Sequence, residues 1–360
     1  MKHVIPIMLL AGMLGCATNQ EGSDESILKP VLVTEPVKHD SDDPAIWLHP
    51  TDRSQSLVIG TDKEEDGALF VFDLNGKIIP EKTVSGLKRP NNVDVEYGFL
   101  LANKQVDIAV TTERFTNKIR VFTLPEMKAI DGGGINVFEG ETQRAPMGVA
   151  LYKRPSDGAI YAIVGRKEGP TTGGYLWQYK LEDNGKGNVR ATKVREFGIW
   201  SGKKEIEAIG VDDELGYVYY SDEQFGVRKY HANPDVPDAN TELALFATSG
   251  FTGDHEGISI YTINGGTGYI LVSDQQANKF QIFTREGEPG NPHLHKLVKV
   301  VKVSTIDSDG SEITSAVVDK RFPSGLFVAM SADRTFHFYS WDDIAGKELV
   351  RAPNGVPSNR

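Results

Sequence analysis

The sequence predicts an all-β protein, a six-bladed β-propeller with four strands in each blade. Three observations lead to this fold class. A short apolar strand, a polar loop and a second alternating strand recur six times along the 360 residues. β-Branched and aromatic residues dominate these segments, and no strong helical period lies between them. The 37 glycines and 18 prolines indicate many turns.

The repeat has the length of one propeller blade. The residues that open the six polar loops lie 50 to 58 positions apart, which leaves room for two further strands in each copy. A β-sandwich is the minor alternative, because its two sheets would not repeat so evenly. The hairpins cover residues 56–74, 106–124, 160–181, 216–232, 268–285 and 325–341, and their loops open at Thr61, Thr111, Gly165, Ser221, Ser273 and Ser331.

The two ends of the predicted domain are expected to meet in the last blade. That blade shows three clear strands within residues 312–341, whereas the N-terminal strand at residues 31–37 has no blade of its own. Pairing this N-terminal strand into the last blade would close the ring and remove two exposed edges. The propeller domain is therefore predicted over residues 30–346, followed by a C-terminal tail over residues 347–360.

The first residues are typical of an export signal. A short polar start precedes an apolar run over residues 4–14 that is too short to span a bilayer, so residues 1–16 are predicted to be a signal peptide. Gly15-Cys16 resembles a bacterial lipobox, and a plain secretory signal with a chance cysteine is the alternative. Residues 17–29 are polar and predict a flexible tether. We expect an exported protein, an outer-membrane lipoprotein or a periplasmic or extracellular one, that meets the membrane only through a lipid on Cys16.

Composition excludes several classes of function. A net charge of −11 argues against nucleic-acid binding by bulk charge. A single cysteine excludes a disulfide framework and a cysteine-rich zinc or iron–sulfur site. A monomer is expected.

Acidic residues recur just ahead of the hairpins, where each opens an apolar strand that would line the central channel. Carboxylates gathered in a partly dehydrated channel repel one another unless a cation neutralises them. Oxygen ligands without cysteine or histidine partners favour calcium over zinc or iron. The alternative is that some of these acids only cap turns and bind water. These acids are Asp42, Asp43, Asp94, Glu207, Asp254, Glu256, Asp309 and Glu312.

The six hairpin loops are expected to share one face of the disc. Most of their charged residues, including Asp62, Asp222 and Asp274, are expected to be solvated.

Two segments resemble a known family. Residues 40–47 (DSDDPAIW) and 91–95 (NNVDV) are similar to the signature segments of the β-propeller phytases, the calcium-dependent alkaline phytases of bacteria. The similarity runs from Glu35 to about Trp341. It implies the propeller fold, several bound calcium ions, and hydrolysis of phytate or calcium-phytate to lower inositol phosphates and inorganic phosphate, as in a 3-phytase.

The resemblance also implies roles for particular residues. Calcium ligands would be Glu35, Asp43, the Pro44 carbonyl, Asp94, Glu207, Glu223, Asp254, Glu256, Gln275 and Asp309. Phosphate would be bound by Lys63, Arg114 and Lys167. Catalysis would rest on Asp43, Asp94, Glu207, Lys63 and Arg114. The chain departs from the family pattern at Glu64, Glu96, Met147 and Ser331.

The expected mechanism is direct attack by water. Bound calcium would invert the local field of an acidic protein, lower the pKa of a bound water and orient the scissile phosphate. The sequence holds neither an RHGxRxP segment nor a Cys-x5-Arg loop that would supply a phosphorylated nucleophile. Two other functions stay open at this point, a non-catalytic calcium-stabilised propeller that binds a partner and a calcium-dependent propeller esterase or lactonase.

Overall fold

The computed structural model describes Met1 and residues 26–353, and almost all of the regular structure within them is β. The predicted signal peptide with Cys16 and most of the predicted tether lie outside the described residues. The first three sheets contain β2 (Ser41–Trp47), β3 (Leu57–Asp62), β4 (Gly67–Phe72) and β5 (Val84–Leu87); β6 (Pro90–Leu101), β7 (Lys104–Glu113), β8 (Lys118–Leu124) and β9 (Ile135–Asn136); β10 (Pro146–Lys153), β11 (Ile160–Arg166), β12 (Leu176–Asp183) and β13 (Val189–Phe197).

The next three sheets have the same antiparallel order. They contain β14 (Ile209–Asp212), β15 (Tyr217–Asp222), β16 (Gly226–His231) and β17 (Ala244–Phe246); β18 (His255–Thr262), β19 (Gly268–Asp274), β20 (Lys279–Thr284) and β21 (Leu297–Lys302); β22 (Ser311–Thr314), β23 (Leu326–Ser331), β24 (Thr335–Ser340) and β1 (Leu32–Val33). The short helices are η1 (Arg53–Gln55), η2 (Pro80–Lys82), η3 (Arg114–Thr116), η4 (Asn264–Gly266), η5 (Gln275–Ala277) and α1 (Trp341–Ala345).

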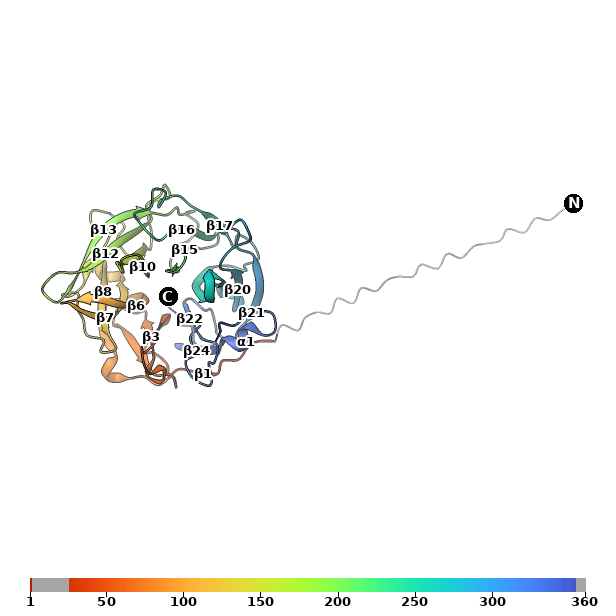
Figure 1. The fold of residues 1–360 in the computed structure, drawn as a ribbon, viewed down its shortest axis with the longest axis horizontal. Coiled ribbons are helices and arrows are strands. Elements are labelled where there is room, and N and C mark those ends of the chain that lie inside the picture. The colour runs from red at the N-terminus through yellow and green to blue at the C-terminus, as the bar shows by residue number, and fades with distance from the viewer. Residues whose placement is uncertain (2–25, 354–360) are drawn as a thin grey trace.

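The sheets stand radially around a common centre. The first strand of each sheet contacts the first strand of the next, and β22 of the last sheet contacts β2 of the first. Figure 1 shows the colour passing once around the ring, so that blades follow one another in chain order. Over residues 26–353 the fold is therefore a six-bladed propeller of four-stranded blades, as the sequence predicts.

The N-terminal strand closes the ring, which confirms that prediction. β1 pairs antiparallel with β24, with Leu32 opposite Phe338. The Val31 amide also donates to the Phe338 carbonyl at 2.7 Å. One blade thus takes strands from both ends of the domain, and breaking it requires the two ends to separate.

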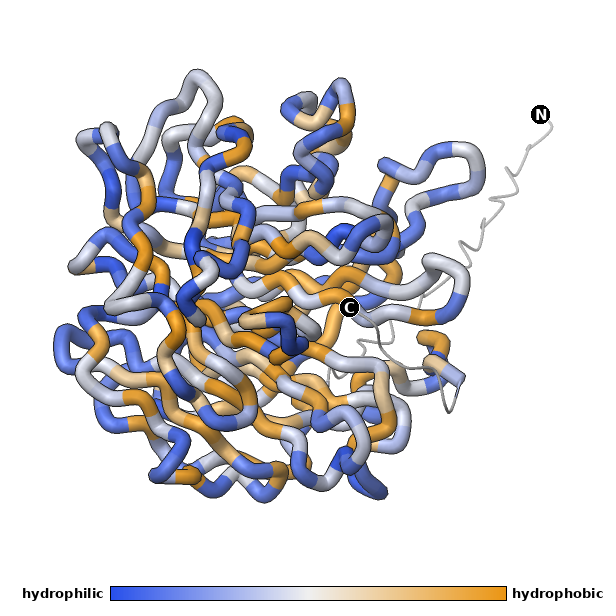
Figure 2. Tube along the Cα trace, turned by 60° about the vertical axis from the view of Figure 1, so that its left-hand side comes forward, coloured by the Kyte–Doolittle hydropathy of each residue, from blue (hydrophilic) through white to orange (hydrophobic). Residues whose placement is uncertain are grey.

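The hydrophobic core lies between neighbouring blades. One cluster, for example, joins Val110 and Val121 of the second blade to Val164 and Trp177 of the third. Figure 2 shows apolar residues concentrated along the strands and hydrophilic residues in the connecting loops. Since neighbouring blades cover both faces of each sheet, the strand sequences are nearly continuous apolar runs.

The packed domain continues beyond residue 346. The Trp341 ring stacks on the Tyr261 ring with centroids 3.9 Å apart. The Ala352 amide donates to the Tyr261 hydroxyl at 2.9 Å, and Ala352 is buried. Residues 347–352 therefore pack on the fifth blade rather than trailing away. Among the described residues, no helix has the length and apolar character needed to cross a membrane.

Three loop acids are buried, so the expectation that they are solvated was wrong. Asp62, Asp222 and Asp274 each end the second strand of a blade and are at most 1% exposed. Each carboxylate accepts backbone N–H groups of the segment that enters the same blade, so that segment is tied to the end of the second strand. The donors are the amides of His39 and Asp40 at 2.8 and 2.7 Å, Ser201 at 2.9 Å and Thr252 at 2.9 Å.

Candidate functional site

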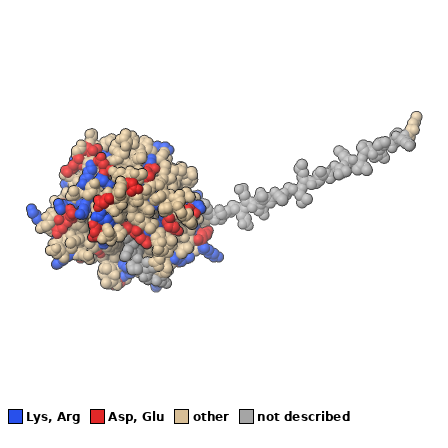
Figure 3. Space-filling model, turned by 45° about the horizontal axis from the view of Figure 1, so that its top comes forward, with Lys and Arg blue, Asp and Glu red and all other residues tan. Residues whose placement is uncertain are grey.

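The antiparallel register brings the inner-strand acids and the hairpin loops to one face of the disc. Ser41 at the start of β2 lies opposite Asp62 at the end of β3, and His255 of β18 lies opposite Asp274 of β19. Residues next to these pairs therefore converge around the mouth of the channel. Figure 3 shows acidic and basic side chains interspersed over the face in view.

Lys63 is the centre of one charged group. Its Nζ lies 2.6 Å from Asp42 Oδ1 and 3.1 Å from Asp309 Oδ2. Asn91 Nδ2 donates to Asp42 Oδ2 at 3.2 Å and to Glu207 Oε1 at 2.9 Å. These contacts join side chains from the first, second, fourth and sixth blades across the mouth.

Lys204 is the centre of a second group. Its Nζ lies 2.7 Å from Glu223 Oε2, 2.7 Å from Asp254 Oδ2 and 3.9 Å from Glu256 Oε1. Gln276 Nε2 also donates to Asp254 Oδ2 at 2.8 Å. The three acids are buried, whereas the Lys204 side chain is 36% exposed.

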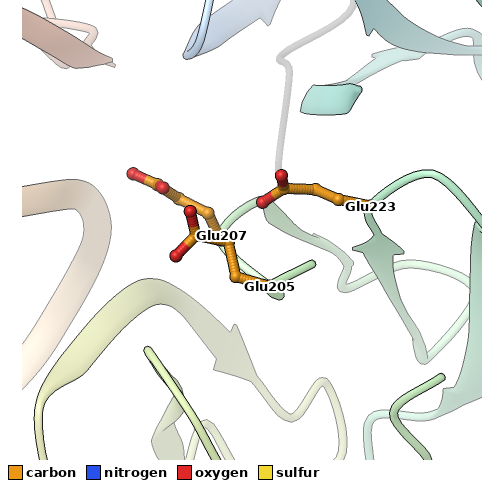
Figure 4. Close-up of side chains that lie close together, drawn as sticks. All are labelled: Glu205, Glu207 and Glu223. Atoms are coloured by element: carbon orange, nitrogen blue, oxygen red, sulfur yellow. The ribbon is translucent and has the colours of Figure 1, made fainter. Parts of the chain in front are cut away.

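Two sets of carboxylates are close enough to share an ion. Glu205, Glu207 and Glu223 each offer an oxygen, and these oxygens lie within 4.8 Å of one another. Glu223, Asp254 and Glu256 meet the same condition. Figure 4 shows the first set, with Glu223 approaching from the side opposite Glu205 and Glu207. Since Glu223 belongs to both sets, the two sets form one continuous acidic cluster.

Burial makes ionisation of several of these acids unfavourable. Burial raises the pKa of Glu223 to about 8, and neighbouring Glu205 and Glu207 add to the effect. Burial also raises the pKa of Asp42 and of Glu256 well above their ordinary values. Each of these acids would be held ionised more readily by an added positive charge.

Two acids in the cluster behave differently. Burial also disfavours ionised Glu207, but the charges of Lys63 and Arg114 outweigh it and lower the pKa of Glu207. For Asp254, hydrogen bonds from Lys204, Gln224 and Gln276 outweigh burial and lower its pKa. Glu207 and Asp254 are therefore the acids of the cluster whose surroundings already favour their ionised forms.

The cluster fits a hard divalent cation. Its donors are carboxylate oxygens, the type that calcium prefers. Glu223 is fully buried, and its Oε1 has no hydrogen-bond donor among the described residues. Buried polar atoms are ordinarily paired, so this oxygen is a natural ligand position.

Asp43 and Asp94 line the channel below the mouth, together with Pro44 and Glu312. Asp43 Oδ2 accepts the Val93 amide at 3.0 Å. Burial raises the pKa of Asp43, and the nearby charges of Glu312 and Asp94 raise it further.

Asp94 also joins two blades. Its Oδ1 accepts the Val95 amide and its Oδ2 accepts the Leu151 amide, both at 2.7 Å. Leu151 belongs to the inner strand of the next blade. Asp94 therefore has a structural role that its motif did not reveal.

The remaining predicted cations lie beside the cluster. The Arg114 guanidinium contacts the Met147 sulfur, and the Lys167 ammonium pairs with Glu205. Gly148, next to Met147, allows the Glu207 carbonyl to approach closely, because a β-carbon there would lie only 1.7 Å from that oxygen. A larger residue at position 148 would therefore push Glu207 out of place.

Gln275 joins the site, whereas Glu35 lies apart from it. The Gln275 amide donates to Asp309. Glu35 follows β1 at the outer edge of the last blade, where it pairs with Lys77 at 2.9 Å and accepts the Ile78 amide. Glu35 is thus not brought together with the mouth acids.

Sequence reasoning missed several members of the site. Asp42 was expected among the channel acids but not as the partner of Lys63, and Asn91, in the second signature segment, was given no role. Lys204 and Glu205 lie on the loop between β13 and β14, and Gln276 lies in the short helix η5, so none of them follows a strand period. The pattern KKEIE, directly before Ala208, was the available signal for Lys204 and Glu205.

Comparisons with known proteins identify the family of the chain. The chain is similar to the 3-phytase of Bacillus subtilis (strain 168), with 30% identity over 323 residues that cover 85% of this chain and 80% of that protein. Kuenenia stuttgartiensis hydrazine synthase is similar in fold alone, with a TM-score of 0.50, 12% identity and 82% of each chain covered. The family model described as Phytase matches residues 7–347, so this chain belongs to the phytase family.

Proposed function

We propose that the protein hydrolyses phytate in a calcium-dependent reaction, as a phosphoric monoester hydrolase of the 3-phytase type. The observation that carries the proposal is the meeting of the acidic cluster with Lys63, Arg114 and Lys167 on one face. A polyanion such as phytate needs positive charge, which the cations supply in part and metal ions would complete. The similarity to a Bacillus 3-phytase supports this choice of substrate.

Metal ions would be held by the carboxylates of the mouth and channel. The mouth set is Glu205, Glu207, Glu223, Asp254 and Glu256, and the channel set is Asp43 and Asp94. When bound, calcium would neutralise phosphate oxygens and lower the pKa of a bound water.

The chain's own cations would bind and orient phosphate. Lys167 is paired with Glu205 of the mouth set, so a metal ion bound there would free its ammonium group. Lys63 is paired with Asp42 and Asp309 beside the sets, where its ammonium faces the same mouth. Arg114 presents a guanidinium suited to two oxygens of one phosphate. Preorganised donors of this kind contribute most where charge develops in the transition state.

Water attack on phosphorus would break the bond from phosphorus to the inositol oxygen. The water oxygen then remains on the released phosphate, and no covalent phosphoenzyme forms. The histidines nearest the mouth do not suit a nucleophile's role: His255 is buried, stacks on Phe251 and bonds the Ala247 carbonyl.

The test is phosphate release from calcium-phytate by the purified protein, with and without a chelator. We expect release with calcium and its loss on chelation. Calcium binding without phosphate release would favour a propeller binding module. Cleavage of carboxylic esters or lactones in place of phytate would favour the esterase alternative.

We also propose that the protein is exported and anchored by a lipid on Cys16. Gly15-Cys16 after the apolar run supports this. Labelling with a radioactive fatty acid should mark the wild-type protein and not the Cys16→Ser variant.

A further inference from the structure

The Lys204 ammonium lies where a cation would bind in the acidic cluster at the mouth of the channel. This mouth cluster consists of Glu205, Glu207, Glu223, Asp254 and Glu256. The Lys204 Nζ is 2.7 Å from oxygens of Glu223 and Asp254 and 3.9 Å from Glu256. These are the same three acids whose oxygens lie within 4.8 Å of one another. The ammonium is therefore placed among the oxygens that would bind a divalent ion.

One lysine does not satisfy this set of acids. Glu223 is fully buried, and its Oε1 has no hydrogen-bond donor in the described part of the chain. Glu256 is buried too, and its oxygen is 3.9 Å from the ammonium, beyond hydrogen-bond distance. The acids are thus arranged for more positive charge than Lys204 alone supplies.

Lys204 can leave the cluster more easily than the acids can. It lies on the loop between β13 and β14, and its side chain is 36% exposed, against 0% for Glu223 and 8% for Asp254. A lysine is a point charge on a flexible four-carbon stem. The acids are fixed by the blades, whereas the ammonium reaches them from the solvent side.

We propose that Lys204 is a tethered competitor for the divalent ion at the Glu223–Asp254–Glu256 set. Calcium lies about 2.3–2.6 Å from its oxygen ligands, so an ion and the ammonium cannot occupy the same oxygens together. Without calcium, Lys204 neutralises part of the set. When calcium binds there, Lys204 must move out, and the cost of displacing it lowers the affinity for the ion. The inference rests on the proposed calcium-dependent function and adds a residue that sets how much calcium the site requires.

The test measures calcium binding directly, by equilibrium dialysis of the metal-depleted full chain. Lys204→Met keeps most of the side-chain length and removes the charge. We expect one calcium ion to bind this variant about tenfold more tightly or better, within the usual range of coupling between two ligands. In a chelator, the Tm of Lys204→Met should fall below that of the wild type, because the buried acids lose their partner.

Two further variants serve as controls. Lys203→Met removes the same charge from the adjacent residue, whose Nζ bonds the Gln224 carbonyl, and should bind calcium as the wild type does. Lys204→Arg retains the positive charge and should bind calcium as weakly as the wild type does. Equal calcium affinity of Lys204→Met and wild type would overturn the inference while leaving the proposed function standing, provided that the wild type releases phosphate from calcium-phytate. If neither protein binds calcium, both proposals fail.

Discussion

The Lys63 ammonium lies 2.6 Å from the Asp42 carboxylate, and the two side chains are 14% and 1% exposed. The same ammonium lies 3.1 Å from Asp309, on the far side of the ring closure. A residue expected to bind phosphate is therefore part of the charge balance of the channel mouth. A change in the charge of these acids would therefore act directly on the position of Lys63.

Lys63→Met should reduce both activity and stability. Loss of a preorganised cation should lower kcat/KM for phytate about 100- to 1000-fold. Asp42 would be left buried without its partner, and breaking such a pair costs about 3–5 kcal/mol. Steady-state kinetics with calcium and denaturant unfolding without calcium measure the two effects.

Lys77→Met is the matched control for Lys63. Lys77 also pairs with an acid, Glu35 at 2.9 Å, but the two side chains are 65% and 41% exposed. Exposed pairs contribute little to stability because solvent screens them, so this variant should resemble the wild type. Equal losses in both variants would show that Lys63 acts only as one surface charge among many.

Removal of calcium should lower the Tm strongly. Ions that bind the folded chain at the mouth cluster stabilise it by mass action. Calorimetry in calcium and in a chelator should show a large difference, and magnesium should substitute poorly because it demands a stricter octahedral geometry. A Tm that does not respond to the chelator would remove the argument for calcium.

Without calcium, Glu223 should make the folded chain less stable as the pH rises from about 5 to 8, while the buried histidines His255, His295 and His337, with their lowered pKa values, act in the opposite direction. Burial raises the pKa of Glu223 from 4.5 to about 8, so the folded chain binds a proton that the unfolded chain has already released within this window. The lowered pKa of Glu207 acts below this window. In calcium-free buffer, the Tm of the wild type should fall relative to that of Glu223→Gln as the pH rises.

Calcium should flatten this pH dependence, because ligated carboxylates stay ionised. Glu223→Gln should also weaken the decline in calcium-free buffer, since it removes the titrating group. The same pH dependence of Tm in Glu223→Gln and in the wild type would contradict the placement of Glu223.

Asp94→Asn should abolish turnover and also destabilise the fold in a chelator. Both carboxylate oxygens accept backbone amides, and the amide nitrogen of asparagine would face one of these donors. An unsatisfied buried group costs about 1–3 kcal/mol. Asp43→Asn should also abolish turnover but should lower the calcium-free Tm less than Asp94→Asn does. A lower calcium-free Tm for Asp43→Asn than for Asp94→Asn would contradict these assignments.

The products should be partly dephosphorylated inositols that retain alternate phosphates. The family resemblance implies two adjacent phosphate pockets. They would bind neighbouring phosphates together, so hydrolysis should slow once no adjacent pair remains. Glu64 and Met147, where the resemblance implies lysine and tyrosine, should weaken the second pocket. Chromatography of the end products measures this, and complete conversion to free inositol would rule out the two-pocket arrangement.

The architecture could be predicted from the amino-acid sequence alone. The recurrence of hairpins at 50 to 58 residues predicted six blades, and the unpaired strand at residues 31–37 predicted the closure that Leu32 and Phe338 make. The sequence also placed Asp42, Asp94 and Asp254 at the openings of inner strands. These features follow from alternation and spacing along the chain, which are local properties of β-strands.

Which charged side chains meet could not be predicted from the sequence, because it depends on how the blades are arranged in space. Lys204 reaches Asp254 across 50 residues, Lys63 reaches Asp309 across 246, and Glu35 pairs with Lys77 away from the mouth. Such contacts join loops of different blades, where no period of the chain fixes the direction of a side chain. The curvature of the ring brings these loops together, and the electrostatic balance of the site exists only once the ring is closed.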